Sequence, residues 1–242
     1  MGKQIDLKKV LQQQLEVDEF FAGDFGLKGK PAPELVESFG DAQTGKSLKE
    51  LADEINKCCK CGLTETRTHA VAGEGNPDAR IVFVGEAPGA DEDAQGRPFV
   101  GRSGKLLTKI INAMGLERKD VFICNILKCR PPENRDPKPE EIVQCEPYLN
   151  AQLDLIRPEI IIALGAHAAK TLLQTTKAIG QLRGRFHDYY FSPDEEPIKL
   201  MPTYHPSYLL RSYSPDNRRR VWGDMQKVLG ELGMEVPTPS KK

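Results

Sequence analysis

The chain of 242 residues is long enough to form one α/β domain with a well-buried core. Its formal net charge of -1 neither requires nor excludes a nucleic-acid partner, because a local basic surface can exist on a protein that is nearly neutral overall. We find no long apolar run and no apolar segment at the N-terminus, so we expect a cytoplasmic protein that is not anchored in a membrane.

The N-terminal part of the chain differs in composition from the rest. Residues 5–20 have helical periodicity, and residues 22–46 are rich in Gly, Pro, Ser and Asp, as linkers are. We therefore expect residues 1–46 to form a helix and a flexible linker, residues 47–235 to form the main domain, and residues 236–242 to form a tail.

From residue 47 onward, helical and strand-like runs alternate. Ser47 and Glu50 make a capping-box pattern, which predicts a helix over about 47–57. Further amphipathic runs predict helices over 103–114, 138–156, 166–174 and 216–232. Apolar runs predict strands over 80–85, 120–127, 159–164 and 198–203. This alternation indicates a three-layer αβα sandwich with a central, mostly parallel four-stranded sheet.

Ligands of such folds bind beyond the carboxyl ends of the parallel strands. The loops 85–104, 125–137 and 203–211 follow strands and should meet there. The first of them reads GEAPGADEDAQGRPFVGRSG and combines glycines and carboxylates with the single aromatic Phe99. We expect Asp91 and Asp93 of this loop to be solvated charges.

The cysteines suggest a metal centre. The six are Cys58, Cys59, Cys61, Cys124, Cys129 and Cys145. Cys58 and Cys61 form a C-x2-C pair, and Cys129 and Cys145 supply two more thiols, the number needed for a 4Fe–4S cluster or a structural zinc ion. Cys124 alternates within a strand and should be buried, and Cys59 is spare. The spacing does not distinguish zinc from iron–sulphur.

The motifs together resemble a known family. GEAPGADEDAQGRPFVGRSGKLL, NILKCRPPENRDPKPEEI followed by Cys145, and HPSYLLR at 205–211 are similar to those of the family 4 uracil-DNA glycosylases, the iron–sulphur branch of that superfamily. The resemblance covers about 58–232. It implies a 4Fe–4S cluster on Cys58, Cys61, Cys129 and Cys145, and a monomeric repair enzyme that hydrolyses the bond between uracil and deoxyribose in DNA. Residues 1–46 lie outside the resemblance and are where a further repair partner would bind.

A glycosylase of this kind must flip the base, read it and cleave the N-glycosidic bond. Phe99 is the expected stacking platform, and Asn125 can present a donor and an acceptor to uracil. Glu86 and Glu92 are the carboxylate candidates. By resemblance, Glu86 activates water or stabilises charge, and Glu92 lies near uracil C5, although the two roles could be exchanged.

The resemblance also implies roles for residues near these motifs. It places His205 over uracil O2, as a hydrogen-bond donor to the developing negative charge, and makes Leu209 the wedge that fills the gap left by the flipped base. Further expected contacts to the base are Gly85, Ala87 and Asn134. Ser103, Ser207 and Arg211 are suited to contact DNA phosphates.

Three other functions remain open at this stage. A related branch traps uracil-DNA covalently, but it carries Gln where Ala87 stands and a basic insertion that the segment KCRPPENRDP at 128–137 lacks. A non-catalytic iron–sulphur DNA-binding module acting with a polymerase has no need of Glu86, Asn125 and His205 together. A structural zinc protein with an unrelated small-molecule site is the last alternative. Base-excision activity would separate all three from a glycosylase.

Overall fold

The computed structural model describes residues 46–191, 195–212 and 214–237. The helix predicted over 5–20 lies outside the described residues, and so does nearly all of the predicted linker. No helix in the described part of the chain is long and apolar enough to cross a membrane.

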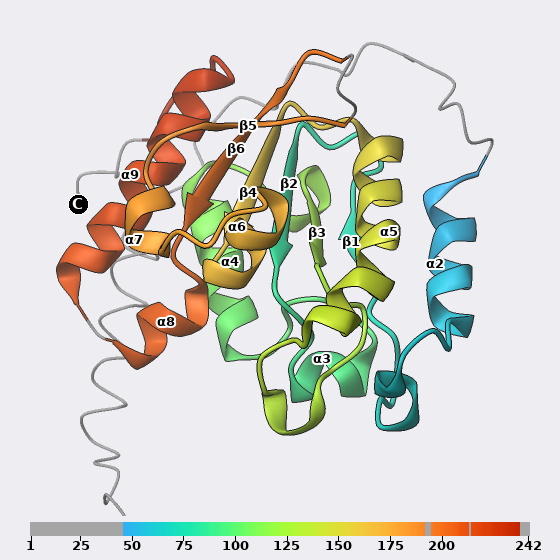
Figure 1. Ribbon diagram of the computed structural model, residues 1–242. Coiled ribbons are helices and arrows are strands. Elements are labelled where there is room, and N and C mark those ends of the chain that lie inside the picture. The colour runs from blue at the N-terminus through green and yellow to red at the C-terminus, as the bar shows by residue number, and fades with distance from the viewer. Residues whose placement is uncertain (1–45, 192–194, 213, 238–242) are drawn as a thin grey trace, which may run out of the picture.

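A six-stranded sheet forms the middle of the fold, with the strand order β1-β3-β2-β4-β6-β5 (Figure 1). The four predicted strands form its parallel centre: β2 (Ile81–Gly85), β3 (Phe122–Asn125), β4 (Ile160–Leu164) and β6 (Ile198–Thr203). The expected number of four strands is corrected to six, because β1 (Glu74–Gly75) and β5 (His187–Tyr189) pair antiparallel at the two edges. These edge strands have two and three residues, too few to show an alternating pattern in the sequence.

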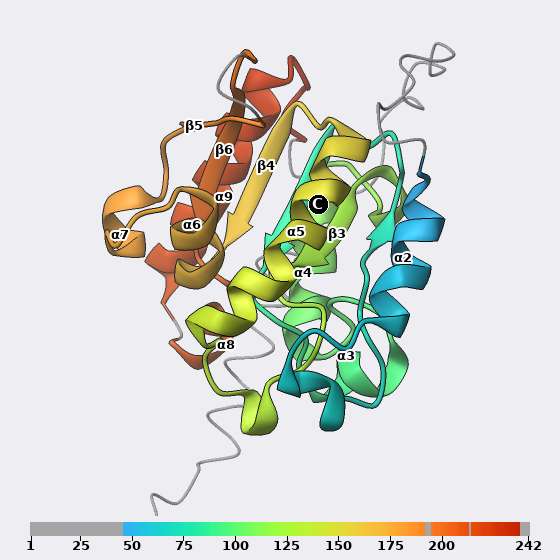
Figure 2. The same cartoon turned by 45° about the vertical axis from the view of Figure 1, so that its right-hand side comes forward.

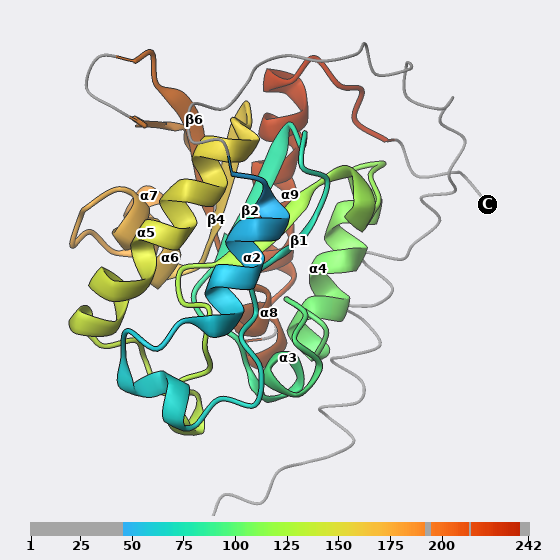
Figure 3. The ribbon, with the colours of Figure 1, turned by 90° about the vertical axis from the view of Figure 1, so that its right-hand side faces the viewer.

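Helices cover both faces of the sheet, as the expected three-layer sandwich requires (Figure 3). One face is covered by α2 (Leu48–Lys57), α5 (Pro139–Ile156), α6 (Ala166–Leu172) and α7 (Ile179–Leu182). The other face is covered by α4 (Arg102–Ala113), α8 (Pro206–Arg211) and α9 (Pro215–Glu231). The described 3-10 turns are η1 (Gly62–Glu65), η2 (Arg118–Asp120) and η3 (Pro132–Asn134). Burial on both faces explains why β2 and β4 are continuous apolar runs.

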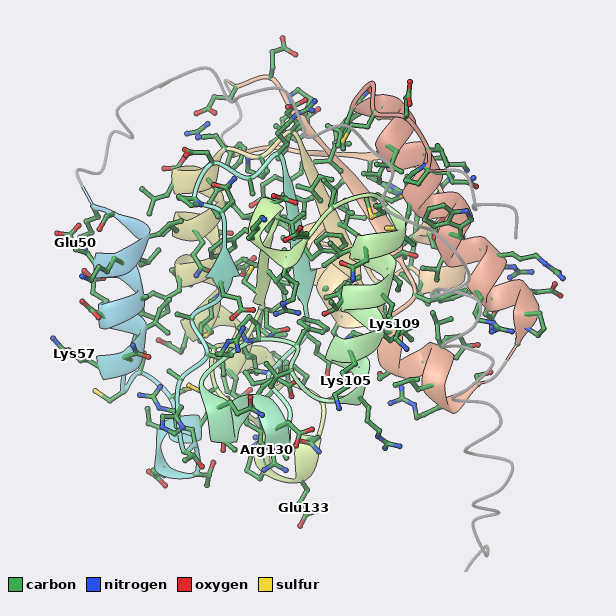
Figure 4. All side chains as sticks on the ribbon, turned by 180° about the vertical axis from the view of Figure 1, so that it is seen from behind. Glu50, Lys57, Lys105, Lys109, Arg130 and Glu133 are labelled. Carbon is green, nitrogen blue, oxygen red and sulfur yellow. The ribbon has the colours of Figure 1, made fainter. Side chains whose placement is uncertain are left out.

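Helix α2 begins at the predicted capping box. The Glu50 N–H donates to Ser47 Oγ at 3.2 Å, and the Ser47 N–H donates to Glu50 Oε2 at 2.7 Å. Leu51 and Ile55 are buried in the core cluster on the α5 side of the sheet. Glu50 and Lys57 point outward from the same helix (Figure 4). Figure 2 shows that α2 lies at one edge of the molecule, with α7 and β5 at the opposite edge.

The loop predicted over 85–104 contains a short helix, α3 (Ala90–Gln95). Its sequence ADEDAQ has no apolar periodicity, so its pattern did not predict a helix. Its carboxylates lie in the first turn, where the helix dipole favours negative charge. Asp93 is buried, not solvated as expected, because its Oδ1 accepts a hydrogen bond of 2.9 Å from the Thr68 N–H.

A buried ion pair holds the end of β6 against α9. The buried carboxylate of Asp224 accepts two hydrogen bonds from the Arg183 guanidinium and one of 2.6 Å from Thr203 Oγ1. Thr203 is the last residue of β6 and directly precedes Tyr204 and His205. The hydrogen bond from Thr203 to the paired carboxylate therefore fixes the start of the segment that leads into α8.

Arg183→Met is expected to lower the free energy of unfolding by about 3–5 kcal/mol, because it leaves the Asp224 charge buried without its partner. Urea denaturation followed by circular dichroism measures the loss. The control is Arg219→Met, which removes the exposed ion pair with Asp216 and should cost about 0–1 kcal/mol. Equal losses in the two variants would contradict this role of the buried pair.

Candidate functional site

A pocket of about 660 Å³ lies beyond the carboxyl ends of the parallel strands. The three loops that were expected to meet at this end of the sheet all contribute to it. Most of the predicted site residues line this pocket: Glu86, Ala87, Glu92, Phe99, Ser103, Asn125, Asn134, His205, Ser207 and Arg211. Among the residues predicted to contact the base or the DNA, Gly85 and Leu209 do not line it.

Asn125 is the least satisfied polar residue of the pocket. It is only 1% exposed, and neither its Nδ2 nor its Oδ1 has a hydrogen-bond partner among the described residues. A buried amide without partners costs on the order of 1–3 kcal/mol per polar group. An amide kept in this state at a pocket wall is suited to a ligand that offers one acceptor and one donor side by side.

Gly85 makes room for this arrangement although it does not face the pocket. It pairs with Asn125 across the parallel strands β2 and β3. A Cβ at Gly85 would lie 2.3 Å from Asn125 Oδ1 and 2.5 Å from Phe99 Cζ. Any larger residue would therefore displace both the amide and the ring.

Phe99 is a buried ring whose backbone adopts a left-handed conformation, with φ of 52°. That conformation is rare for a bulky residue and persists only where the surroundings enforce it. Arg118 Nη1 donates to the Phe99 carbonyl at 3.1 Å, and Arg118 Nη2 donates to the Pro98 carbonyl at 2.8 Å. The ring centroid lies 5.7 Å from that of His205, so the two rings share one part of the pocket.

Glu92 uses its carboxylate to hold the same loop. Its Oε1 accepts from the Val100 and Gly101 N–H groups at 2.9 Å each, and its Oε2 accepts from the Gly89 N–H at 3.1 Å. The residue is buried and lines the pocket, but both oxygens are occupied by backbone donors. The geometry therefore favours a role in positioning Phe99.

The carboxylate of Glu86, in contrast, accepts no hydrogen bond from any residue that the structure describes, although the Glu86 backbone carbonyl accepts one of 3.0 Å from the Leu127 N–H. Burial raises the pKa of its carboxyl, the neighbouring Asp136 raises it further, and His167 and Arg211 lower it. His167 Nε2 lies 3.6 Å from Asp136 Oδ2, and ligand atoms of Glu86, Asp136 and His167 lie within 4.8 Å of one another. The carboxylate of Glu86 is thus available to a ligand or a water molecule.

His205 is held as a neutral imidazole with a defined tautomer. Its Nδ1 accepts a hydrogen bond of 3.1 Å from the Ser207 N–H, so the ring proton must be on Nε2. Burial, aided by the charge of Arg211, lowers the pKa of His205 to about 4. Gly165 permits this placement, because a Cβ there would lie 2.9 Å from the His205 Cβ. His205 therefore offers a neutral N–H donor to the pocket.

The structure places Leu209 in the core and not at the surface. The side chain is 1% exposed and belongs to the apolar cluster beneath α4 and α9, so it is not available to DNA in this conformation. Packing of the amphipathic α8 against that cluster is the physical reason. Tyr208, which the sequence analysis missed, is the exposed aromatic residue of α8 and lines the pocket.

Asn134 lies at the outer rim of the pocket. Its Oδ1 accepts a hydrogen bond of 2.8 Å from Arg130 Nε, and it follows Glu133 in a turn where both residues have positive φ. Figure 4 shows Arg130 and Glu133 on this turn, with Glu133 projecting away from the body of the protein.

The four cysteines expected to bind a metal centre line a second pocket together. Cys58 ends α2, Cys61 precedes η1, Cys129 follows β3 and Cys145 lies in α5. Burial raises the pKa of Cys145 to about 11, so a bound metal would have to displace its proton. Cys124 is buried in β3 as predicted, and Cys59 is exposed.

The spacing of these sulphurs bears on what they can hold. One zinc ion in a tetrahedron of thiolates keeps the sulphur atoms about 3.8 Å apart, since the Zn–S bond is about 2.3 Å. Among the described residues, the group of three or more ligand atoms within 4.8 Å is that of Glu86, Asp136 and His167, and no three cysteine sulphurs lie so close. These sulphurs are therefore not gathered as closely as the ligands of one bound zinc ion.

Hydrogen bonds to the sulphurs complete this second pocket. Arg67 Nη1 donates to Cys129 Sγ at 2.9 Å, and the Lys128 N–H donates to Cys145 Sγ at 3.2 Å. Donors of this kind stabilise thiolate ligands in metal centres.

The fold and the site define a class of αβα proteins with a pocket at the carboxyl ends of the parallel strands. The family model of the uracil DNA glycosylase superfamily matches residues 72–226, and the chain belongs to this superfamily.

Curated relatives narrow the assignment. The chain is 49% identical over 197 residues to the type-4 uracil-DNA glycosylase of Saccharolobus solfataricus, a match that covers 79% of this chain and 89% of the relative. It is 48% identical to the type-4 enzyme of Thermotoga maritima, over 76% of this chain and 95% of the relative. It is 46% identical to that of Archaeoglobus fulgidus, over 80% of this chain and 97% of the relative. The chain therefore belongs to the type-4 uracil-DNA glycosylases.

Proposed function

We infer that this chain is a uracil-DNA glycosylase of DNA repair, which hydrolyses the N-glycosidic bond of deoxyuridine and leaves an abasic site. The observation that carries the inference is the buried, unpartnered amide of Asn125 at the pocket wall. Uracil offers O4 as an acceptor and N3–H as a donor, and one amide can pair with both. Cytosine has the inverse pattern and would leave buried groups unpaired on both sides.

The pocket supplies the other groups that the reaction needs. The Phe99 ring is the stacking surface for the flipped base. His205 donates its Nε2–H to uracil O2 as negative charge develops on the leaving base. Glu86 stabilises the cationic sugar and orients the water whose oxygen bonds to C1′ as the C1′–N1 bond breaks, with Glu86 accepting the water proton.

The remaining residues position the DNA and the loop. Glu92 holds the Phe99 loop through three backbone donors, and Ala87 and Asn134 border the base. Ser103, Ser207 and Arg211 are the proposed phosphate contacts. We assign the exposed ring of Tyr208, and not the buried Leu209, to the surface of α8 that meets the DNA.

We further propose that Cys58, Cys61, Cys129 and Cys145 hold a 4Fe–4S cluster. The support is the shared pocket and the hydrogen-bond donors on two of the sulphurs. When bound, the cluster supplies iron–thiolate bonds that join the 58–61 segment to β3 and α5, and it takes no part in the hydrolysis. A monomeric state, a cytoplasmic location and a repair partner for residues 1–46 stay predictions.

The function is tested by incubating the protein with labelled oligonucleotides that carry one uracil, then revealing abasic sites with alkali. Strand breaks are expected at uracil and not at cytosine or thymine. His205→Ala should lower the single-turnover rate by about 10²–10³-fold, because it removes the donor to the leaving base. His187→Ala, on the edge strand β5, is the matched control and should retain the rate.

Absence of product from a folded protein would contradict the inference. A protein–DNA adduct that survives denaturation would favour the branch that traps uracil-DNA covalently.

The pH dependence follows from Glu86, which must be ionised to act. Burial raises its pKa above the ordinary 4.5. The single-turnover rate should therefore rise with pH, and the midpoint of this rise should lie above pH 4.5. The charge of Arg211 lowers that pKa, and Arg211→Gln should therefore move the midpoint of the pH–rate profile to higher pH. Arg219→Gln, in an exposed ion pair, is the control. An unchanged midpoint in Arg211→Gln would contradict the assignment of Glu86.

The cluster proposal predicts a brown protein with about four iron and four sulphide per chain after anaerobic purification. Cys145→Ser should lower the iron content, because it removes one ligand. Cys59→Ser, which changes an exposed cysteine outside the proposed ligand set, should leave it unchanged. Stoichiometric zinc without sulphide would refute the proposal.

A further inference from the structure

Lys128 is a buried lysine that none of the functions above uses. Its side chain is 1% exposed, and lysines are almost never buried to this degree unless they are paired. It lies three residues after Asn125 and directly before Cys129. It therefore sits between the residue that reads the base and a residue of the cysteine pocket.

The side chain of Lys128 holds the backbone of Asn125. Its Nζ donates to the Asn125 carbonyl at 2.7 Å and to Gln152 Oε1 at 2.5 Å. Gln152 is itself fixed, because its Nε2 donates to the Ala72 carbonyl at 2.5 Å. The turn that follows β3 is thus tied to α5 and to the segment before β1.

The backbone of Lys128 contacts the cysteine pocket. Its N–H donates to Cys145 Sγ at 3.2 Å, and its carbonyl accepts from the Val71 N–H at 2.7 Å. Lys128 also lines the cysteine pocket. A single residue therefore touches a sulphur of one site and the main chain of the base-reading residue of the other.

We propose that Lys128 is a positioning residue for uracil recognition, which couples the cysteine pocket to the orientation of the Asn125 amide. The proposal rests on the proposed function, since it assumes that Asn125 reads uracil. Without the Nζ donor, the Asn125 carbonyl and Gln152 Oε1 would be buried acceptors without a partner, and the turn would rearrange to satisfy them. The side-chain amide would then no longer be held in one orientation toward the pocket.

The proposed 4Fe–4S cluster gives Lys128 a second role, because Lys128 lines the cysteine pocket. Iron–sulphur clusters are held by thiolates, and hydrogen bonds to the sulphurs set their properties. Loss of the hydrogen bonds from Lys128 Nζ should therefore also make the segment that bears Cys129 more mobile. A lysine that only filled space in the core would affect stability, but not the preference for uracil or the retention of the cluster.

The test compares Lys128→Met with the wild-type holoprotein. Methionine keeps the length and the apolar stem but removes the donors. The probes are oligonucleotides with one 2′-fluorinated deoxyuridine, which resists cleavage, or with deoxycytidine at the same place. The ratio of the two affinities should fall about tenfold in Lys128→Met, while the affinity for the cytosine probe stays unchanged. Bleaching of the cluster absorbance by a chelator should become several-fold faster.

Lys49→Met is the matched control, because Lys49 is exposed on α2. It should change neither the affinity ratio nor the bleaching rate. Gln152→Met is the second variant, and it decides the question if Lys128→Met does not fold. It removes one of the two partners of Nζ and should lower the ratio as well, by a smaller factor.

An unchanged affinity ratio in a folded Lys128→Met protein, or in Gln152→Met if that variant alone folds, would overturn the proposal. A wild-type holoprotein that shows no preference for the uracil probe would instead overturn the proposed function. The two failures are therefore distinguishable in one experiment.

Discussion

The site depends on one constraint, which is that the Asn125 amide is kept buried without a partner. Such a group raises the free energy of the folded state, and neighbouring residues hold it in place. Gly85 leaves the space that the amide and the Phe99 ring occupy, and Lys128 fixes the carbonyl of the same residue. The parallel register of β2 and β3 places these elements side by side at the carboxyl ends of the strands. In the proposed function, a ligand with adjacent donor and acceptor groups removes this cost, which would make binding selective.

The carboxylates of the first loop divide into two kinds once their partners are known. The carboxylates of Glu92 and Asp93 accept hydrogen bonds from backbone N–H groups and so shape the loop, whereas the carboxylate of Glu86 has no hydrogen-bond partner in the described part of the chain. The carboxyl of Glu86 is raised in pKa by burial, while His205 is kept neutral. The pocket thus offers a carboxylate that can accept a proton from water and a neutral donor that can face the leaving base.

Much of this arrangement was predictable from the sequence, and the rest was not for physical reasons. The apolar runs of the parallel strands and the Ser47–Glu50 capping box have strong local signals, and the cysteine spacing anticipated the gathering of four thiols. The edge strands are too short, and α3 too polar, to leave a periodic pattern. Burial of Leu209 and the hydrogen bonds of Glu92 and Lys128 depend on tertiary contacts that no local pattern encodes.

The central claim is that Asn125 reads uracil through both atoms of its amide. The most direct measurement is a crystal structure of the holoprotein with a duplex that contains one 2′-fluorinated deoxyuridine. The account predicts a flipped base with Asn125 Nδ2 donating to O4 and Oδ1 accepting from N3–H, each at about 2.9 Å, against the Phe99 ring. A flipped base held elsewhere in the pocket, with the Asn125 amide still unpartnered, would contradict it.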